Sequence, residues 1–243
     1  INPYGRKITE EELLKEIVNI DGLIAGTEPI TKKVLNNADK LKVISRVGVG
    51  TDNIDLECAA KKNIDVRISS QGPINAVAEY TIGLILSSLR GIHTGNRLVK
   101  EGTWKKIIGK DLSNCVIGVI GAGNIGKKVI QLLSSFTPVE IIFFDPYAKE
   151  ETILKAKKVS FNEILKTSDV LTLHLPLTNE SYGLIKTGEL KKMKKDAVLI
   201  NTARGGIVNE EDLFNALKSK LIAGAAIDVF EKEPYFGGLV GLD

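Results

Sequence analysis

The sequence has few of the residues that build disulfide frameworks, metal centres and stacking surfaces. Its 243 residues include two cysteines, two histidines, one tryptophan and one methionine, and aromatic residues make up 5% of the total. Cys58 and Cys115 are too few for a disulfide framework or a zinc site. Both have apolar neighbours, which predicts buried, reduced thiols in a cytoplasmic protein. We therefore predict no metal site.

Long apolar runs are also missing. None approaches the ~20 consecutive residues that a membrane-spanning helix needs, so we expect no membrane partner. With 43% hydrophobic and 26% charged residues, the composition is typical of a globular protein. The length predicts one large domain or two modest ones.

Positive charge is in slight excess, but arginine is scarce. The formal net charge is +3, and only six of the 33 basic residues are arginines. A nucleic-acid-binding surface more often combines clustered arginine with aromatic side chains. We predict no nucleic-acid partner.

Apolar, β-branched runs alternate with amphipathic stretches along nearly the whole chain. In the first part, a capping box at residues 9–12 begins a helix, and the pattern then predicts strands at 22–26, 42–48 and 65–69 with helices at 31–39 and 54–63. Parallel strands need such crossover helices. A mostly apolar helix at 74–90 follows, and we predict a domain boundary near its end, which divides the chain into residues 1–87 and 88–243.

The second part repeats the alternation more strongly. Strands are predicted at 116–121, 140–145, 170–175, 197–203 and 223–230, and helices at 124–136, 161–166, 187–193 and 210–221. These strands are continuous apolar runs, which is typical of parallel sheets covered by helices on both faces. The predicted fold class is therefore α/β, with parallel sheets in two domains.

A glycine-rich turn links the first of these strands to its helix. Residues 116–126 read VIGVIGAGNIG, a buried strand that runs into G-x-G-x-x-G. Gly121 permits the tight turn, Gly123 lets a pyrophosphate approach the backbone, and Gly126 lets the helix pack close to the strand. The free N–H groups and the positive end of the helix dipole then favour a diphosphate.

An acid ends the next strand. Asp145 lies 19 residues after Gly126, where a carboxylate can accept hydrogen bonds from the adenosine ribose hydroxyls. It would repel a 2′-phosphate, and Pro146 and Tyr147 bring no arginine, so the pattern favours NAD over NADP. Two alternatives stay open at this point: a glycine-rich turn without a ligand, and an S-adenosylmethionine site, which uses a similar turn and acid.

Polar residues follow three later strands, at the edge where open α/β sheets bind their ligands. They are His174, the run from Asn201 to Gly206, and the run from Asp228 to Pro234. Arg204 follows a buried strand and precedes two glycines, so we expect its guanidinium in a cleft, where its planar fork suits a substrate carboxylate. The alternative is a structural arginine paired with a nearby acid.

Together these residues resemble the D-isomer-specific 2-hydroxyacid dehydrogenase family, and the D-3-phosphoglycerate dehydrogenase branch in particular. The similar motifs, in order, are 46–55 (RVGVGTDNID), 75–79 (NAVAE), the glycine turn with Asp145, 174–178 (HLPLT), 201–205 (NTARG) and 228–234 (DVFEKEP). They cover nearly the whole chain. The resemblance implies two Rossmann-like domains. Residues 1–87 would form the substrate-binding domain, parts of which are expected before residue 1 and after residue 243. Residues 88–243 would form the NAD-binding domain.

The resemblance also implies roles for individual residues. A homodimer would interconvert a D-2-hydroxy acid and its 2-keto acid by hydride transfer, with 3-phosphoglycerate among the candidate substrates. Arg204 would bind the substrate carboxylate and carbonyl, the backbone at Val49 and Gly50 would hold the carboxylate, and Glu233 would support a catalytic histidine. The implied NAD-binding residues are Gly121, Gly123, Asn124, Ile125, Gly126, Asp145, His174, Pro176, Thr202, Ala203 and Asp228.

Two departures from the family pattern affect these expectations. The family's catalytic histidine follows the Glu-Pro pair, so it is expected beyond Asp243, and neither His93 nor His174 takes its place. Phosphoglycerate enzymes usually carry an arginine in the loop where this chain has Glu28; Arg46 is the alternative residue for a phosphate, but Glu28 disfavours phosphoglycerate. A non-enzymatic NAD(H)-sensing protein of the same fold is the alternative function, because such proteins keep the dinucleotide turn.

Overall fold

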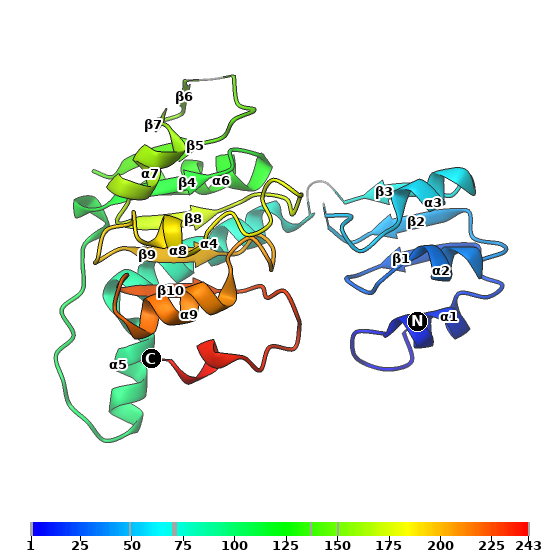
Figure 1. The fold of residues 1–243 in the computed structure, drawn as a ribbon, viewed down its shortest axis with the longest axis horizontal. Coiled ribbons are helices and arrows are strands. Elements are labelled where there is room, and N and C mark those ends of the chain that lie inside the picture. The colour runs from blue at the N-terminus through cyan, green and yellow to red at the C-terminus, as the bar shows by residue number, and fades with distance from the viewer. Residues whose placement is uncertain (1, 49, 70–71, 137, 150, 243) are drawn as a thin grey trace. The chain divides into compact units, whose positions relative to one another are not determined.

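The computed structural model describes residues 2–48, 50–69, 72–136, 138–149 and 151–242. The backbone forms two compact units, residues 1–74 and 75–243, each with its own sheet (Figure 1). The sequence placed the boundary 13 residues later, inside a helix. The division comes earlier because Ala78, Ile82 and Ile85 of this helix lie in the core of the second unit. The functions expected of the two units stay predictions.

The first unit is a three-stranded parallel sheet with its crossover helices. Its elements are α1 (Glu10–Glu16), β1 (Gly22–Ala25), α2 (Lys32–Asn36), β2 (Val43–Arg46), α3 (Leu56–Lys61) and β3 (Asp65–Ile68), with strand order β1-β2-β3. Each helix begins at a side-chain cap, in which Thr9, Thr31 and Asp55 accept backbone N–H groups. The predicted capping box at Thr9 and Glu12 is present.

The second unit contains the longest helix and a seven-stranded sheet. Its helices are α4 (Gly72–Arg90, which starts at the end of the first unit), α5 (Ile92–Lys100), η1 (Leu112–Asn114), α6 (Asn124–Leu133), α7 (Phe161–Thr167), α8 (Thr187–Leu190), α9 (Glu210–Lys218) and η2 (Gly238–Gly241). Its strands are β4 (Val116–Ile120), β5 (Glu140–Phe144), β6 (Thr152–Ile153), β7 (Ala156–Lys158), β8 (Val170–Leu173), β9 (Val198–Asn201) and β10 (Gly224–Ile227).

The strand order in this sheet is β10-β9-β8-β4-β5-β7-β6. All neighbouring strands are parallel except β6 and β7. Strands β5 to β7 lie on one side of β4, and β8 to β10, which come later in the chain, lie on the other side. The order therefore reverses between β4 and β8, and open α/β sheets bind ligands at the carboxyl ends of strands beside such a reversal.

Helices cover both faces of this sheet, as the continuous apolar strands predict. One buried cluster joins α4 and α6 to β4 and β5 through residues such as Ile85 and Val129. A second cluster joins α7, α8 and α9 to β8 and β9, with Leu165 and Leu213 among its members. Every residue of β8 and β9 is buried. This packing holds the carboxyl ends of the central strands on a rigid support.

The expected α/β class with parallel sheets is confirmed. The C-terminal ends of the strands differ from the predicted ends in a regular way. The strands stop one to three residues before the predicted ends, and the residues that follow them form loops. The hairpin of β6 and β7 was not predicted. Its strands are two and three residues long, and Leu154 in its turn has φ +53°, a conformation for which leucine gives no signal.

Within the described residues, no helix is long and apolar enough to cross a membrane.

Candidate functional site

The glycine turn after β4 has the geometry that its sequence predicts. Gly121 has φ +93°, and a Cβ added there would collide with the carbonyl oxygen of His174. A Cβ at Gly126 would collide with the carbonyl oxygen of Gly121. Both positions therefore require glycine for the fold itself: Gly121 for the turn, and Gly126 for the close packing of α6 against it.

Gly123 differs from these two glycines. It is the N-cap of α6 in an extended conformation, and nothing lies within 4 Å of a Cβ added there. No side chain caps the helix, so the amides of Asn124 and Ile125 at its start are not covered by a capping side chain. An anion can therefore approach the backbone here, and the ten-residue helix adds its dipole. This opening fits a dinucleotide pyrophosphate.

Asp145 is held rigidly beside this turn. One of its oxygens, Oδ2, accepts the N–H of Ala122 at 2.8 Å, and Oδ1 accepts the N–H groups of Tyr147 at 2.8 Å and Ala148 at 3.2 Å. Oδ1 thus uses both of its lone pairs, and Oδ2 keeps one. The backbone thus fixes the acid at the end of β5 while leaving Oδ2 able to accept a hydrogen bond from a ribose hydroxyl.

His174 follows β8 and lies directly behind the glycine turn. Its N–H donates to the carbonyl of Ile120 at 2.7 Å, and its Nε2 pairs with the hydroxyl of Thr172 at 3.0 Å. Its other ring nitrogen, Nδ1, is enclosed without a hydrogen-bond partner. Burial of the ring lowers the pKa of His174 to about 3. The ring is therefore neutral at physiological pH, which agrees with the expectation that His174 is not the catalytic histidine.

This burial predicts an effect of pH on stability. In the unfolded chain the pKa of His174 returns to 6.5 from about 3, so the unfolded protein binds the extra proton and stability falls as the pH drops below 6.5. Between about pH 7 and pH 5, we expect the wild type to lose about 2 kcal/mol more of its free energy of unfolding than His174→Gln does. Urea unfolding at the two pH values measures this, with His93→Gln on the exposed face of α5 as control. Equal losses of stability in the wild type and in His174→Gln would contradict the conclusion that His174 is buried and neutral.

Asn201 shapes the turn that presents Arg204. Its side chain is 1% exposed; Oδ1 accepts the N–H of Ala203 and Nδ2 donates to the carbonyl of Arg204, both at 3.0 Å. The half-buried Arg204 donates from its guanidinium to the Ala203 carbonyl at 2.7 Å. A Cβ at Gly205 would collide with the backbone of Phe230. The glycine after Arg204 is therefore needed where the loops after β9 and β10 pack together.

Thr202 is tied to α4 by a buried contact. Its hydroxyl lies 2.9 Å from that of Thr81, which also donates to the Val77 carbonyl at 2.8 Å. Thr81 is fully buried and Thr202 is 7% exposed. The pair fixes the end of β9 against α4, beside the turn that carries Arg204.

Removing one of these two hydroxyls leaves the other without its buried partner. We expect Thr202→Val to lower the free energy of unfolding by about 1 kcal/mol, the net value of one hydrogen bond, because Thr81 keeps its bond to the Val77 carbonyl. The double variant Thr81→Val/Thr202→Val is expected to recover part of that loss, because both polar groups are then gone. Urea denaturation of the wild type, Thr202→Val, Thr81→Val and the double variant measures both effects. Strictly additive losses would contradict a direct bond between the two threonines.

The loop after β10 carries two more acids from the predicted site. Asp228 is exposed, and its N–H donates to the carbonyl of Asn201 at 3.0 Å. Partial burial and the nearby Asp228 carboxylate raise the pKa of Tyr80 on α4. Glu233 accepts the N–H of Phe230 at 3.1 Å, which closes a small turn and leaves the carboxylate at the surface.

The predicted substrate loop belongs to the first unit. Val49 lies outside the described residues, and Gly50 follows β2 in a loop. The buried Arg46 donates to the carbonyl of Val47, and a Cβ at Gly48 (φ +137°) would meet its guanidinium. In the loop after β1, both carboxylate oxygens of Glu28 accept the N–H of Gly26, at 3.0 and 3.1 Å. Arg46 is thus packed beneath its own loop.

Comparison with known proteins identifies the family. Residues 82–238 match the family described as D-isomer specific 2-hydroxyacid dehydrogenase, NAD binding domain. This chain belongs to that family. The match covers more than half of the chain and confirms the resemblance and the predicted cofactor, NAD.

Relatives and solved structures of this dehydrogenase family agree along most of the chain. It is 41% identical over 235 residues to D-3-phosphoglycerate dehydrogenase of Methanocaldococcus jannaschii, covering 93% of this chain and 44% of that protein. It is also 41% identical to glyoxylate reductase of Thermofilum pendens, with 93% and 69% covered. D-lactate dehydrogenase from Aquifex aeolicus, solved with NAD and lactic acid, has a TM-score of 0.85 at 30% identity, with 93% and 69% covered. The chain thus spans less than half of the phosphoglycerate enzyme.

Within the second unit, the predicted NAD-binding residues follow adjacent strands. Gly121, Gly123, Asn124, Ile125 and Gly126 follow β4; Asp145 follows β5; His174 and Pro176 follow β8; Thr202 and Ala203 follow β9; Asp228 follows β10. Their roles stay predictions. Sequence reasoning missed Thr81 and Tyr80, and gave Asn201 no role. A hydroxyl on the apolar stripe of the 74–90 helix was the one signal that could have indicated Thr81.

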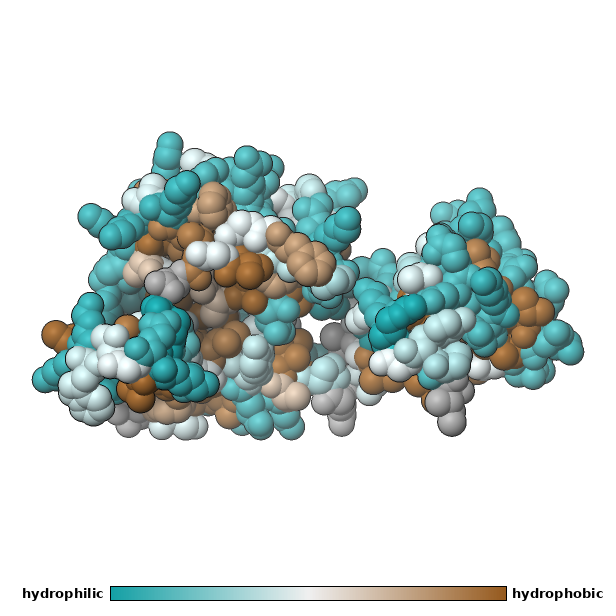
Figure 2. Space-filling model, turned by 90° about the horizontal axis from the view of Figure 1, so that it is seen from below, coloured by the Kyte–Doolittle hydropathy of each residue, from teal (hydrophilic) through white to brown (hydrophobic). Residues whose placement is uncertain are grey.

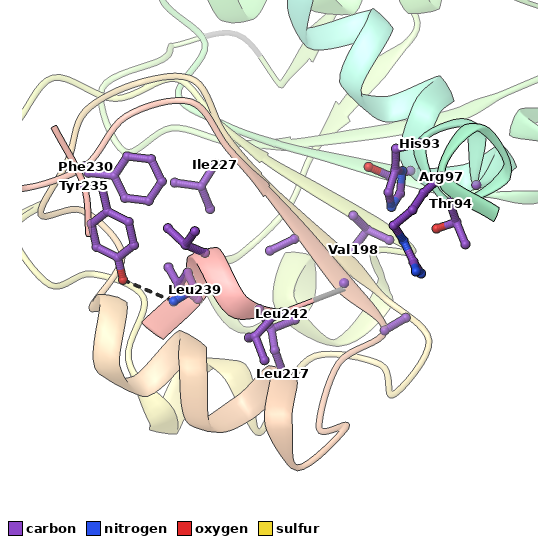
Figure 3. A pocket seen from close by; sticks show the side chains of 16 residues that line it. His93, Thr94, Arg97, Val198, Leu217, Ile227, Phe230, Tyr235, Leu239 and Leu242 are labelled. Atoms are coloured by element: carbon purple, nitrogen blue, oxygen red, sulfur yellow. Dashed lines mark hydrogen bonds between the residues drawn. The ribbon is translucent and has the colours of Figure 1, made fainter. Parts of the chain in front are cut away.

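A cavity of about 600 Å³ lies elsewhere in the same unit (Figure 3). It runs along the free edge of β10, between α5 and η2, and its wall includes His93, Arg97 and the stacked rings of Phe230 and Tyr235, 4.1 Å apart. Apolar residues gather at the surface on this side of the unit (Figure 2). None of the predicted NAD- or substrate-binding residues lines this cavity.

Among the described residues, no group of three or more histidine, cysteine, aspartate and glutamate side chains is placed to hold a metal ion.

Proposed function

We propose that the protein is an NAD-dependent dehydrogenase that interconverts a D-2-hydroxy acid and its 2-keto acid. The observation that carries the proposal is the match of residues 82–238 to the family's NAD-binding domain, on a turn whose geometry is open at Gly123 and closed at Gly121 and Gly126. All eight curated relatives compared are named as dehydrogenases or reductases.

Different residues of the second unit would bind different parts of NAD. The amides after Gly123 would bind the pyrophosphate, and Asp145 would accept the ribose hydroxyls. The loops after β8, β9 and β10 would line the rest, with Thr202, Ala203 and Asp228 toward the nicotinamide. Bound NAD would supply the acceptor for the hydride that leaves C2 of the hydroxy acid.

Arg204 is proposed to bind and orient the substrate. Its planar guanidinium can hold a carboxylate by two parallel hydrogen bonds and polarise the neighbouring carbonyl. The Val49–Gly50 backbone would bind the same carboxylate. The resemblance places the proton-transferring histidine outside these 243 residues, with Glu233 as the acid that orients it and raises its pKa. His174 is unsuited to that role because its ring is enclosed and neutral.

The substrate is a small 2-hydroxy or 2-keto acid, and 3-phosphoglycerate remains one candidate. Two features of the first unit disfavour binding of its phosphate group. Glu28 places a carboxylate in the loop after β1, and the guanidinium of Arg46 is directed to the carbonyl of Val47. We therefore expect smaller acids such as glyoxylate and hydroxypyruvate to be reduced faster than phosphohydroxypyruvate.

NADH oxidation by the full-length protein with a panel of 2-keto acids tests the proposal. Turnover of at least one acid is expected, with formation of the D-hydroxy acid. NADH binding without turnover of any acid would favour an NAD(H)-sensing protein instead. The relatives reported above give that alternative no support.

A homodimer is proposed as the assembly, and a cytoplasmic location stays a prediction. The segment from α5 to residue 108 exposes large apolar side chains: Ile92 (58%), Val99 (60%), Trp104 (93%) and Ile108 (90%). Such a surface typically marks a protein–protein contact. Sedimentation equilibrium is expected to give a dimer mass, and a monomer at high concentration would contradict it.

A further inference from the structure

A hydrogen bond joins two loops on opposite sides of the dinucleotide turn. The hydroxyl of Tyr147 donates to Oε2 of Glu180 at 2.8 Å. Tyr147 lies three residues after the end of β5, and Glu180 lies in the loop after β8. Both β5 and β8 pair with β4, one on each side. The bond therefore connects the loops that flank the carboxyl end of β4, where the glycine turn begins.

The same tyrosine is bonded to the ribose-binding acid. Its N–H donates to Oδ1 of Asp145 at 2.8 Å, and Oδ2 of Asp145 accepts the N–H of Ala122 in the glycine turn at 2.8 Å. An unbroken series of hydrogen bonds thus runs from the turn through Asp145 and Tyr147 to Glu180. The nearby Glu180 carboxylate, and to a lesser extent that of Asp145, raises the pKa of Tyr147, so the phenol keeps its proton as a donor.

The backbone on both sides of the bond is fixed. Glu180 lies in a turn where the Ser181 hydroxyl donates to the Pro176 carbonyl at 2.7 Å and the Tyr182 N–H donates to the Thr178 carbonyl at 2.9 Å. On the other side, Lys158 donates to the carbonyl of Ala148 at 2.6 Å. The side chains themselves are at the surface, with Tyr147 78% exposed. Rotation of two exposed side chains is therefore enough to break the link without moving either loop.

We propose that Tyr147 and Glu180 form a clasp over the adenosine end of the dinucleotide site and slow the release of NAD(H). This inference rests on the proposed function, because it takes the adenosine ribose to bind Asp145. An adenosine held there lies between the two loops that the bond joins, so it leaves only after the clasp opens. Tyr147 and Glu180 are positioning residues that act on the exchange of the cofactor.

A second tyrosine–glutamate bond in the same unit offers a matched control. The hydroxyl of Tyr182 donates to Oε1 of Glu231, also at 2.8 Å, and Tyr182 is 55% exposed. This bond joins the loop after β8 to the loop after β10, across β9. It has the same chemistry, length and loop as the clasp but does not span β4.

The test measures NADH release from the full-length protein by stopped-flow displacement. We expect Tyr147→Phe and Glu180→Ala each to release NADH about fivefold faster, because each removes one hydrogen bond at the surface, where such bonds contribute little. The double variant should be no faster than either single one, because both remove the same bond. The affinity for AMP should fall in these variants while that for nicotinamide mononucleotide stays unchanged. Tyr182→Phe should bind AMP as the wild type does.

The outcomes separate the clasp from the function on which it rests. Wild-type release rates in Tyr147→Phe and Glu180→Ala overturn the clasp while leaving NAD binding in place. Additive effects in the double variant, or an equal loss of AMP affinity in Tyr182→Phe, overturn it too, because the bond across β4 is then not the cause. If the unaltered protein binds no NADH at all, the proposed function fails and the clasp fails with it.

Discussion

Arg204→Ala is expected to lower kcat/KM for the preferred 2-keto acid by about 10³-fold, with unchanged NADH affinity. Two charge-assisted hydrogen bonds to the substrate carboxylate are lost together, and each contributes about 1.5–3 kcal/mol. The loop itself should keep its shape, because Asn201 fixes the turn through Ala203 N–H and the Arg204 carbonyl, which the variant retains. Steady-state kinetics with direct NADH titration measures both quantities.

Arg204→Lys is the matched control, since it keeps the charge but not the planar fork. We expect it to recover only part of the lost activity and to act mainly on KM. Near-wild-type kinetics for Arg204→Ala would remove this residue from the substrate site. It would favour the alternative, an arginine whose role is structural.

Gly126→Ala is expected to destabilise the second unit by about 3 kcal/mol and to abolish NADH binding. The added methyl group would collide with the carbonyl oxygen of Gly121, so α6 has to move away from the turn, which is the cost of overpacking a rigid contact. Thermal unfolding and NADH fluorescence titration measure the two effects.

Gly123→Ala provides the contrast. No atom lies within 4 Å of the added Cβ, and the backbone conformation suits alanine, so wild-type stability is expected. The methyl group would nevertheless occupy the space through which the pyrophosphate approaches, and a loss of about 30-fold in NADH affinity is expected. Gly188→Ala in α8, which also has open space around it, should change neither property. Equal NADH affinity in Gly123→Ala and wild type would place the pyrophosphate elsewhere.

The parts of the fold that depend on local patterns were predictable. The apolar run 116–120 followed by G-x-G-x-x-G indicates a strand, a turn and a helix, and the structure has β4 and α6 at these positions. Asp145 could be assigned from its distance along the chain, because the length of a βαβ unit fixes where the next strand ends. Arg204 could be singled out because a charged residue directly follows a fully apolar strand.

Contacts between distant residues could not be predicted from local patterns. Thr81 and Thr202 are 121 residues apart, and the bond between them depends on the packing of α4 against the end of β9. Tyr147 and Glu180 come together only because β4 lies between β5 and β8 in the sheet. Strand order carries no local sequence signal, so the residues that join neighbouring loops are found only in the folded structure.

The domain boundary shows a related limit. The apolar character of α4 indicates burial, but it does not reveal which unit buries the helix. Ala78, Ile82 and Leu89 pack with Ile117 and Val129 in the core of the second unit, so this unit begins at residue 75 instead of residue 88. Composition alone could not assign a helix that lies between two sheets in the sequence.

Calorimetric titration of the protein with NADH, and then with NADPH, tests the central claim most directly. The account predicts one NADH bound per chain at the turn after β4, much weaker binding of NADPH because Asp145 repels a 2′-phosphate, and loss of the NADH heat in the stably folded Gly123→Ala variant. No heat with either coenzyme, or undiminished NADH binding by Gly123→Ala, would contradict it.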